Sequence, residues 1–304
     1  MSALYGAAGH FIDVSQILAD LKGESSWVVS NQHFGDPCFG KFKALVVTQP
    51  DGQIRYYPEG AEVHFSEPEI PTISRPLYGY YHLLVGKSGL EIGGPSLSCA
   101  DLDIYTAPAR IDNLIFSSQT LWSCHQEGQE YTFPGKLAPG KVHIADVVEM
   151  KSLPDAGQDF VFASHVLEHL VNPLRALQEI TRILKPEGLC ILILPYPPNT
   201  FDHRRPITPV SELIQHYQEG RDESDVLDHL PGILPYYDLS RDPGAGTLEQ
   251  FIERCKDHVH NRALHVHVFD FKLIIECLTV FGYQIIDMQL SGLHQVVVGQ
   301  KKLI

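Results

Sequence analysis

The middle of the chain has the pattern of a strand, a helix and a second strand. Asp159–Ala163 is an apolar run of strand length, and Val166–Leu184 then repeats apolar residues at helical spacing. The helical stripe consists of Leu167, Leu170, Leu174, Leu177, Ile180 and Leu184. Cys190–Leu194 is wholly apolar, as a strand buried on both faces should be. This order predicts a parallel α/β sheet.

Other apolar runs predict the remaining core elements. Strands are expected at Arg110–Phe116, Val142–Ala145, Tyr283–Gln289 and Gln295–Gln300, with a last helix at Phe271–Phe281. Ligands of open parallel sheets bind beyond the carboxyl ends of the strands. Ser164, His165 and the polar loop Tyr196–Pro209 each follow such an end, so we expect them to face a site.

Residues 1–65 have a different pattern, with three short β-type runs separated by turn-forming segments. The runs are Trp27–Val29, Ala44–Thr48 and Ile54–Tyr57. They predict a small β module, and the segments DVSQIL and NQHFGDPCFGKFKALVV resemble a little-studied β domain that is also found joined to other folds. We expect the module to be either an auxiliary unit or a structural cap on the larger domain. As an auxiliary unit it would serve in binding or in oligomerisation, and the latter would make the protein a homo-oligomer. A segment with three prolines begins the second domain, residues 66–304.

Composition limits the class of protein. The 304 residues, 44% of them hydrophobic, suffice for one large domain and a small one. A net charge of -14 argues against nucleic acid or an anionic membrane as the partner, because both need clustered Lys and Arg. A small-molecule substrate fits better. The sequence shows neither a leader pattern nor an apolar run of membrane-spanning length, so we expect a cytoplasmic protein.

The cysteines are scattered along the chain without a Cys-x-x-Cys pair. Their positions are Cys38, Cys99, Cys124, Cys190, Cys255 and Cys277. This spacing indicates neither a zinc knuckle nor a disulfide framework, so we expect reduced core thiols.

The segment DFVFASHVLEHLVNPLRALQEITRILKPEGLCILILP resembles the fourth strand, fourth helix and fifth strand of class I S-adenosylmethionine-dependent methyltransferases. It is most similar to the "type 11" domains, and TFDHRRPITP with NRALHVHVFD resembles a poorly characterised subgroup of them. The resemblance covers about Leu83–Lys301. It implies a Rossmann-like seven-stranded sheet with helices on both faces and an antiparallel last strand beside the sixth. It also implies S-adenosyl-L-methionine as the cofactor.

The glycine-rich segment Gly89–Ser96 follows a predicted helix at Leu77–Val85 and the first core strand. In the resembling family, an acidic residue and glycines here allow the backbone to approach the methionine part of the cofactor, where a Cβ would collide. Glu91, Gly93 and Gly94 match that pattern. Pro95 departs from it, because the family has a later glycine.

The resemblance also assigns the rest of the cofactor site. Asp112, with Asn113 beside it, would accept hydrogen bonds from the ribose hydroxyls, unless Asp112 only forms a turn. Asp146 falls where the family binds the adenine amino group, and Val147 would pack on the adenine ring. Ser164 and His165 would complete the site.

His165, Glu168 and His169 can be interpreted in two ways. On a helix these positions share a face, so the three side chains could bind a divalent metal. The Glu-His pair also resembles that of metal-dependent small-RNA end methyltransferases, although their first ligand is Glu. Alternatively, the pair serves the helix locally, as in methyltransferases that use no metal.

A polar insertion at about 196–268 separates the fifth strand from the last helix, and we expect it to select the substrate. His203 is the first candidate for the general base, with Asp202 to orient it, because imidazole titrates near neutral pH. Arg204 and Arg205 suit an anionic substrate group or, alternatively, pair with the acidic run 222–228.

The segment HVHVFDF places two further histidines near the end of the insertion. Its alternation predicts a strand with His265 and His267 on one face, either lining the substrate or metal site or buried as structural groups.

The sequence therefore predicts a methyltransferase that acts on a small molecule, with O-methylation of a sugar or specialised metabolite preferred. One alternative is a methyltransferase fold used for cyclase, isomerase or metal-assisted chemistry, which Pro95 keeps open. A second is a non-catalytic protein that binds carbohydrate or a partner. The density of titratable groups in the insertion argues against the second alternative.

Overall fold

The computed structural model describes residues 2–7, 10–21, 26–37, 43–48, 54–60, 62–64, 77, 79–120, 124–131, 140–242 and 244–303. The predicted proline-rich segment at 66–76 and Cys38 lie outside these ranges. None of the helices in the described ranges has the length and apolarity that crossing a bilayer requires.

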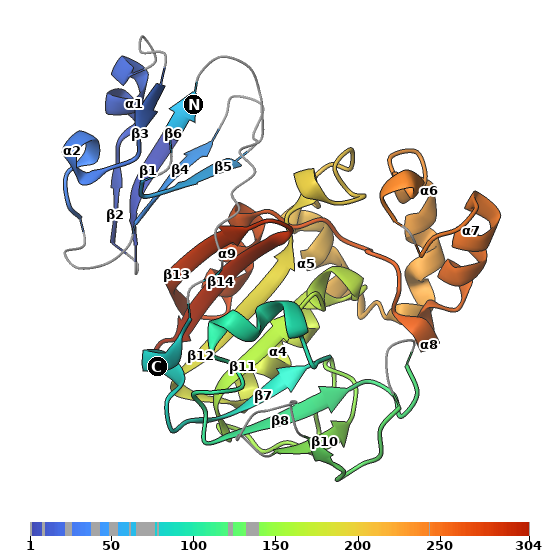
Figure 1. Cartoon of the computed structure of the whole chain (residues 1–304). Helices are drawn as coiled ribbons and strands as arrows, with labels where there is room; N and C mark the ends of the chain where they lie inside the picture. The colour runs from blue at the N-terminus through green and yellow to red at the C-terminus, as the bar shows by residue number, and fades with distance from the viewer. Residues whose placement is uncertain are drawn as a thin grey trace.

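The largest sheet has eight strands in the order β13-β14-β12-β11-β7-β8-β10-β9 (Figure 1). Their bounds are β7 Ser88–Ile92, β8 Arg110–Ile115, β9 Glu130–Tyr131, β10 Gly140–Ile144, β11 Gln158–Ser164, β12 Leu184–Pro195, β13 Tyr283–Ser291 and β14 His294–Lys301. The five strands from β10 to β12 pair in parallel, whereas β14 is antiparallel to both of its neighbours. This confirms the predicted Rossmann-like methyltransferase sheet, to which β9 adds a short edge strand.

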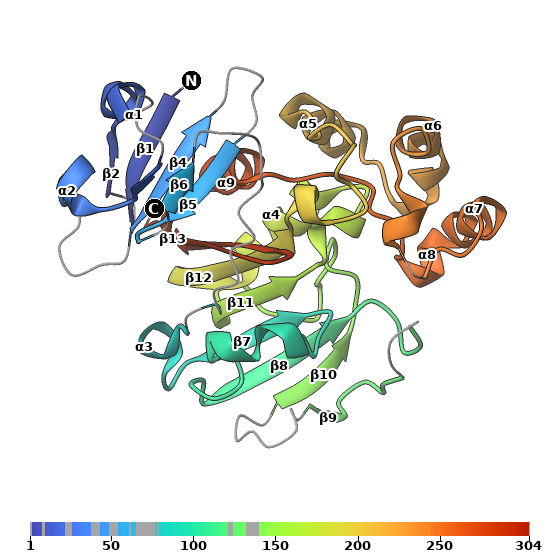
Figure 2. The ribbon, with the colours of Figure 1, turned by 45° about the horizontal axis from the view of Figure 1, so that its top comes forward.

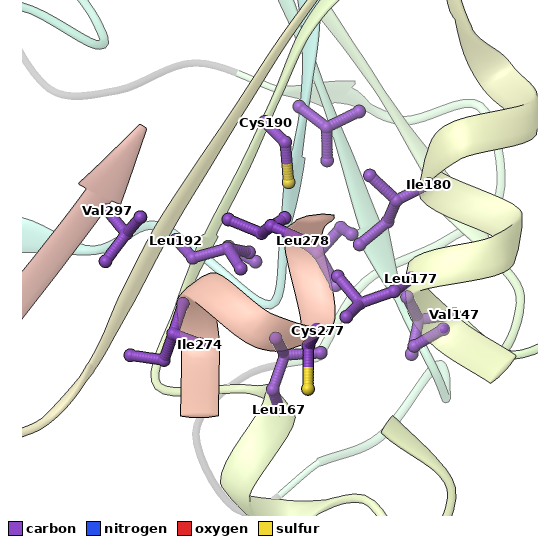
Figure 3. Close-up of a cluster of buried hydrophobic side chains, with 14 of the residues drawn as sticks. Val147, Leu167, Leu177, Ile180, Cys190, Leu192, Ile274, Cys277, Leu278 and Val297 are labelled. Carbon is purple, nitrogen blue, oxygen red and sulfur yellow. The ribbon is translucent and has the colours of Figure 1, made fainter. Parts of the chain in front are cut away.

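Both faces of this sheet are covered. On one face, α4 (Pro173–Ile183) and α9 (Phe271–Val280) pack their apolar residues against β11, β12 and β14. Figure 3 shows Leu177 and Ile180 of α4 and Leu278 of α9 around Cys190 and Leu192 of β12. The opposite face carries the short helices α3 (Tyr81–Leu84) and η1 (Leu97–Leu102). The predicted helix at Leu77–Val85 is therefore one turn long.

The helix predicted at Val166–Leu184 is wrong in its first part. Only a 3₁₀ turn, η2 (Leu167–His169), precedes α4, which begins at Pro173. Proline disfavours the helical conformation for the residue before it, and the Asn172 side chain caps α4 by accepting a hydrogen bond from the Arg175 N–H (3.1 Å).

The insertion is mostly helical and has its own small core. It contains α5 Val210–Glu219, η4 Glu223–His229, α6 Leu230–Ile233, α7 Leu248–Lys256 and α8 His258–Asn261. Buried Val226, Phe251 and Leu264 pack together with Val171, which precedes α4. Figure 1 shows α5–α8 beyond the arrowheads of the parallel strands, so the insertion covers the end of the sheet where ligands bind.

The N-terminal residues form a separate antiparallel sheet in the order β2-β1-β4-β5. Its strands are β1 Ser2–Ala7, β2 His10–Asp13, β4 Ala44–Thr48 and β5 Ile54–Pro58, while β3 Ser26–Val28 pairs with β6 Glu62–His64. The helices α1 (Ser15–Leu21) and α2 (Asn31–Phe34) contribute to its core. Val46 packs against the core of the large sheet, and β1 contacts β13. Figure 2 shows the small sheet beside β13 and α9. The boundary at residue 65 stays a prediction.

The described cysteines are all free thiols. Four of them are buried, as predicted, whereas Cys124 is exposed.

Candidate active site

The glycine loop follows β7 at the carboxyl edge of the sheet. Gly93 has φ +92°, a backbone conformation that L side chains rarely adopt, and a Cβ there would lie 3.3 Å from Val166 Cγ2. A Cβ at Gly94 would collide with the carboxyl group of Glu91. Both glycines are therefore required by the loop itself, and Gly93 leaves its backbone open to a ligand.

Glu91 lies fully buried beneath this loop. Its carboxyl group accepts hydrogen bonds from the hydroxyls of Tyr105 (2.8 Å) and Tyr131 (2.5 Å) and from the Ser96 N–H (3.0 Å). Burial raises its pKa despite these hydrogen bonds. Glu91 thus holds the loop in place. Asn113, its partner in the β7–β8 register, is also fully buried, and neither polar atom of its side chain has a hydrogen-bond partner in the described structure.

Asp112 lies inside β8, which continues to Ile115. Its carboxylate accepts hydrogen bonds from Arg110 Nε (2.9 Å) and the Lys141 N–H (2.7 Å), and His143 Nε2 lies 3.3 Å away. The carboxylate therefore braces β8 against β10. Its predicted contact with ribose remains a prediction.

Asp146 follows β10, as the sequence predicted, and Val147 is buried beside it in the core. The Asp146 carboxylate pairs with Arg262, whose other terminal nitrogen lies 2.7 Å from Glu223 Oε1. The Arg262 guanidinium also lies over the Phe116 ring, 5.1 Å from its centroid. Arg262 ties the insertion to the predicted adenine end of the site, and sequence reasoning missed it because it is far from Asp146 in the chain.

His165 follows β11 directly. Its φ of +54° is not helical, so the prediction that His165, Glu168 and His169 share one helical face is wrong. Its Nε2 lies 2.9 Å from His294 Nδ1, and burial lowers its pKa to about 3. Ser164 Oγ lies 3.5 Å from Cys99 Sγ.

Glu168 is buried without a hydrogen-bond partner for either carboxylate oxygen. Burial raises its pKa to about 7, although the neighbouring His265 opposes the shift. The ligand atoms of Glu168, His169 and His265 lie within 4.8 Å of one another, which is close enough to hold a metal ion. In this group His265 takes the place predicted for His165, whose Nδ1 lies 3.5 Å from Glu168 Oε1.

Asp202 orients His265 and not His203. His265 Nδ1 donates to Asp202 Oδ2 (2.6 Å), and Arg205 donates to Asp202 Oδ1 (2.7 Å). Burial alone would raise the pKa of Asp202, but these hydrogen bonds hold it below its usual range. Arg205 also donates to the backbone carbonyls of His265 and Val266 (both 2.8 Å), so it fixes the segment that carries His265.

His203 points the other way. Its Nε2 lies 2.9 Å from Asp238 Oδ2, and Arg204, which is 61% exposed, lies 3.4 Å from the same oxygen. Neither arginine pairs with the acidic run 222–228, so that alternative is wrong.

His265 and His267 do not lie on one face of a strand, because residues 262–270 contain no strand. His265 contacts Asp202 and the edge of His169, with ring centroids 4.6 Å apart. His267 instead lies beside His216 and His229. The two histidines belong to separate clusters.

Residues 94–192 match the family model described as "Methyltransferase domain". No curated protein matches the chain. The match covers less than half of the chain and includes β8, β10, β11 and α4, with most of β12.

Solved structures of methyltransferases resemble the fold at low identity. A SAM-dependent methyltransferase from Methanosarcina mazei has a TM-score of 0.43 and 16% identity, and covers 76% of this chain and 100% of its own. An S-adenosylmethionine-dependent methyltransferase from Mesorhizobium loti has a TM-score of 0.42 and 13% identity, with 72% and 92% coverage. The carbon methyltransferase CurJ has a TM-score of 0.39 and 12% identity. The match covers 72% of this chain and 49% of CurJ, so this chain spans about half of the length of CurJ.

TM-scores below 0.5 do not establish a shared function. The family match and the strand order support a class I methyltransferase fold for the large sheet, and this fold is associated with S-adenosylmethionine.

Proposed function

We propose that the protein is an S-adenosylmethionine-dependent methyltransferase that methylates an oxygen of a small polar acceptor, such as a sugar or a specialised metabolite. The observation that carries the proposal is the buried Asp202–His265 pair. The pair supplies an oriented proton acceptor within the insertion. It belongs to a cluster of side chains that extends to the end of β11, next to the glycine loop. The family match over residues 94–192 supports the cofactor.

The residues at the strand ends fit this cofactor in part. Gly93 presents open backbone with a positive φ, as close approach of a ligand requires, and Asn113 has a buried amide without a partner. Gly93, Gly94 and Ser164 would hold the methionine end, and Asp146 with Val147 the adenine end. Glu91 and Asp112 would act by shaping these segments, because their carboxylates are already hydrogen-bonded.

S-adenosylmethionine, when bound, would supply a sulfonium methyl group for transfer to an oxygen of the acceptor. His265 Nδ1 donates its proton to Asp202, which leaves Nε2 as the nitrogen that can take the acceptor's proton. Asp202 also stabilises the imidazolium that forms. Arg205 keeps Asp202 charged and the His265 backbone fixed, so the base is oriented before the acceptor arrives.

Glu168 and His169 adjoin His265, with their ligand atoms within 4.8 Å of its own. A carboxyl group with a pKa of about 7 can either donate a hydrogen bond to an acceptor hydroxyl or accept one. A small polar acceptor matches these neighbours and the net charge of -14, which disfavours anionic polymers. Binding of a divalent metal, predicted for His165, Glu168 and His169, stays a prediction, and the structure brings Glu168 and His169 together with His265 instead of His165.

The test compares His265 with His203, which both lie in the insertion. His265→Ala should lower the turnover number by about 100-fold or more, the usual contribution of a general base, and should leave S-adenosylhomocysteine binding intact. His203→Ala is the matched control, because His203 faces Asp238, and it should keep most of the turnover. The measurement is formation of S-adenosylhomocysteine with a panel of sugars and hydroxylated metabolites. Full turnover by His265→Ala would refute the role of His265.

A further inference from the structure

A second cluster of histidines lies under α5, away from the Asp202–His265 pair. Glu212 and His216 are one turn apart on α5 and share a face, and His229 ends η4. His267 comes from the extended segment before α9. The ring centroids of His216, His229 and His267 lie 4.9–5.6 Å from one another.

One backbone carbonyl fixes the tautomers of two of these rings. His216 Nδ1 and His267 Nε2 each lie 3.2 Å from the Val171 oxygen. A carbonyl oxygen only accepts hydrogen bonds, so both nitrogens carry the proton and donate it. His216 Nε2 and His267 Nδ1 are therefore left with bare lone pairs. Metal-bound histidines commonly have their second nitrogen held in this way.

Two ring nitrogens of this cluster are buried without a hydrogen-bond partner in the part of the chain that the structure describes. His267 is fully buried, and its Nδ1 has no hydrogen-bond partner in the described structure. The same holds for His229 Nε2. A buried polar atom without a partner is unfavourable, and an ion that binds to it removes that cost. His267 Nδ1 lies 3.7 Å from Glu212 Oε1, so it faces the carboxylate.

We propose that Glu212, His216, His229 and His267 bind one zinc ion, which fixes α5 to the rest of the insertion. The ligand atoms of Glu212, His216 and His229 lie within 4.8 Å of one another, and His267 Nδ1 supplies the fourth position. Three imidazoles and one carboxylate suit Zn²⁺, which prefers four nitrogen, sulfur or oxygen ligands.

Access from solvent agrees with this assignment. A cavity of about 420 Å³, lined by Glu212, His216 and His229, gives the ion a route from solvent. The four proposed ligands are distinct from Asp202 and His265, so the zinc proposal does not rest on the proposed function.

The experiment uses the full chain, stripped with a chelator, dialysed and titrated with zinc chloride. We expect one zinc per chain at this site, seen by elemental analysis, and a higher melting temperature after loading. His216→Ala should weaken zinc binding by about 100-fold or more, since even indirect ligand partners contribute 10–100-fold. Glu212→Gln, at a half-exposed position that the fold tolerates, should weaken it as well.

His169→Ala is the control, because His169 belongs to the separate group with Glu168 and His265, and it should keep the affinity of the parent protein at the proposed site. Absence of zinc binding by the folded parent protein would overturn the proposal. So would zinc binding that survives both His216→Ala and Glu212→Gln, or that is lost only in His169→Ala, because the ion would then lie elsewhere.

Discussion

Replacing Asp202 with alanine should destabilise the protein strongly. Asp202 is 2% exposed and shares its carboxylate between Arg205 and His265. The Arg205 side chain is only 6% exposed, so the replacement leaves a guanidinium charge buried without its counter-ion. Breaking a buried pair in this way costs about 3–5 kcal/mol. Asp202→Asn should cost less, because its amide oxygen still accepts one of the hydrogen bonds.

An exposed ion pair of equal length provides the matched control. Lys256 Nζ lies 2.7 Å from Glu253 Oε2, the same distance as between Arg205 and Asp202, but its partners are 55% and 74% exposed. Glu253→Ala should therefore cost only about 0.2–1 kcal/mol. The assay is urea unfolding of each variant, followed by circular dichroism. Equal free-energy losses for the two variants would refute the claim that burial makes the Asp202 pair important.

Three further predictions concern the loop, its buried acid and a helix cap. Gly93→Val should abolish S-adenosylhomocysteine binding in a folded protein, because a β-branched side chain strains φ +92° and meets Val166; retained affinity in calorimetry would contradict the loop assignment. The raised pKa of Glu91 means that the parent protein loses stability as pH rises from 4.5 through the folded-state pKa. As the pH rises from 4.5 to 8, the free energy of unfolding of Glu91→Gln should therefore increase relative to that of the parent protein. Parallel curves of unfolding free energy against pH for the two proteins would exclude the raised pKa. Asn172→Ala should cost about 2–4 kcal/mol in urea unfolding, because it removes a cap and the two hydrogen bonds that the Asn172 amide donates to the carbonyls of His216 and Arg221. The exposed cap removed in Thr247→Ala should cost about 1 kcal/mol, and equal costs would refute this.

The sheet could be predicted from sequence because its signals are local. The strands β11 and β12 each contain an uninterrupted apolar run, and the crossover helix α4 has a regular apolar stripe. The start of α4 was misplaced because the stripe continues upstream of Pro173, although the Asn172-Pro173 pair is itself a readable helix start. The same kind of signal, Thr247-x-x-Gln250, marks α7 in the insertion.

The residues that belong to the site could be predicted from the sequence, but the pairs that they form could not. Asp202, His203 and His265 were all candidates, but the pairing depends on which way each side chain leaves a loop. Asp202 and His203 are adjacent and face opposite partners, whereas His265 reaches Asp202 across 63 residues. No local pattern specifies such a contact, since the packing of the insertion determines it.

The central claim, that the protein binds S-adenosylmethionine, is tested most directly by calorimetric titration of the purified full chain. The account predicts binding of S-adenosylmethionine and S-adenosylhomocysteine at one site with a dissociation constant on the order of micromolar, about -8 kcal/mol. Gly93→Val should show no binding under the same conditions. Absence of binding by a parent protein that unfolds cooperatively would contradict the account.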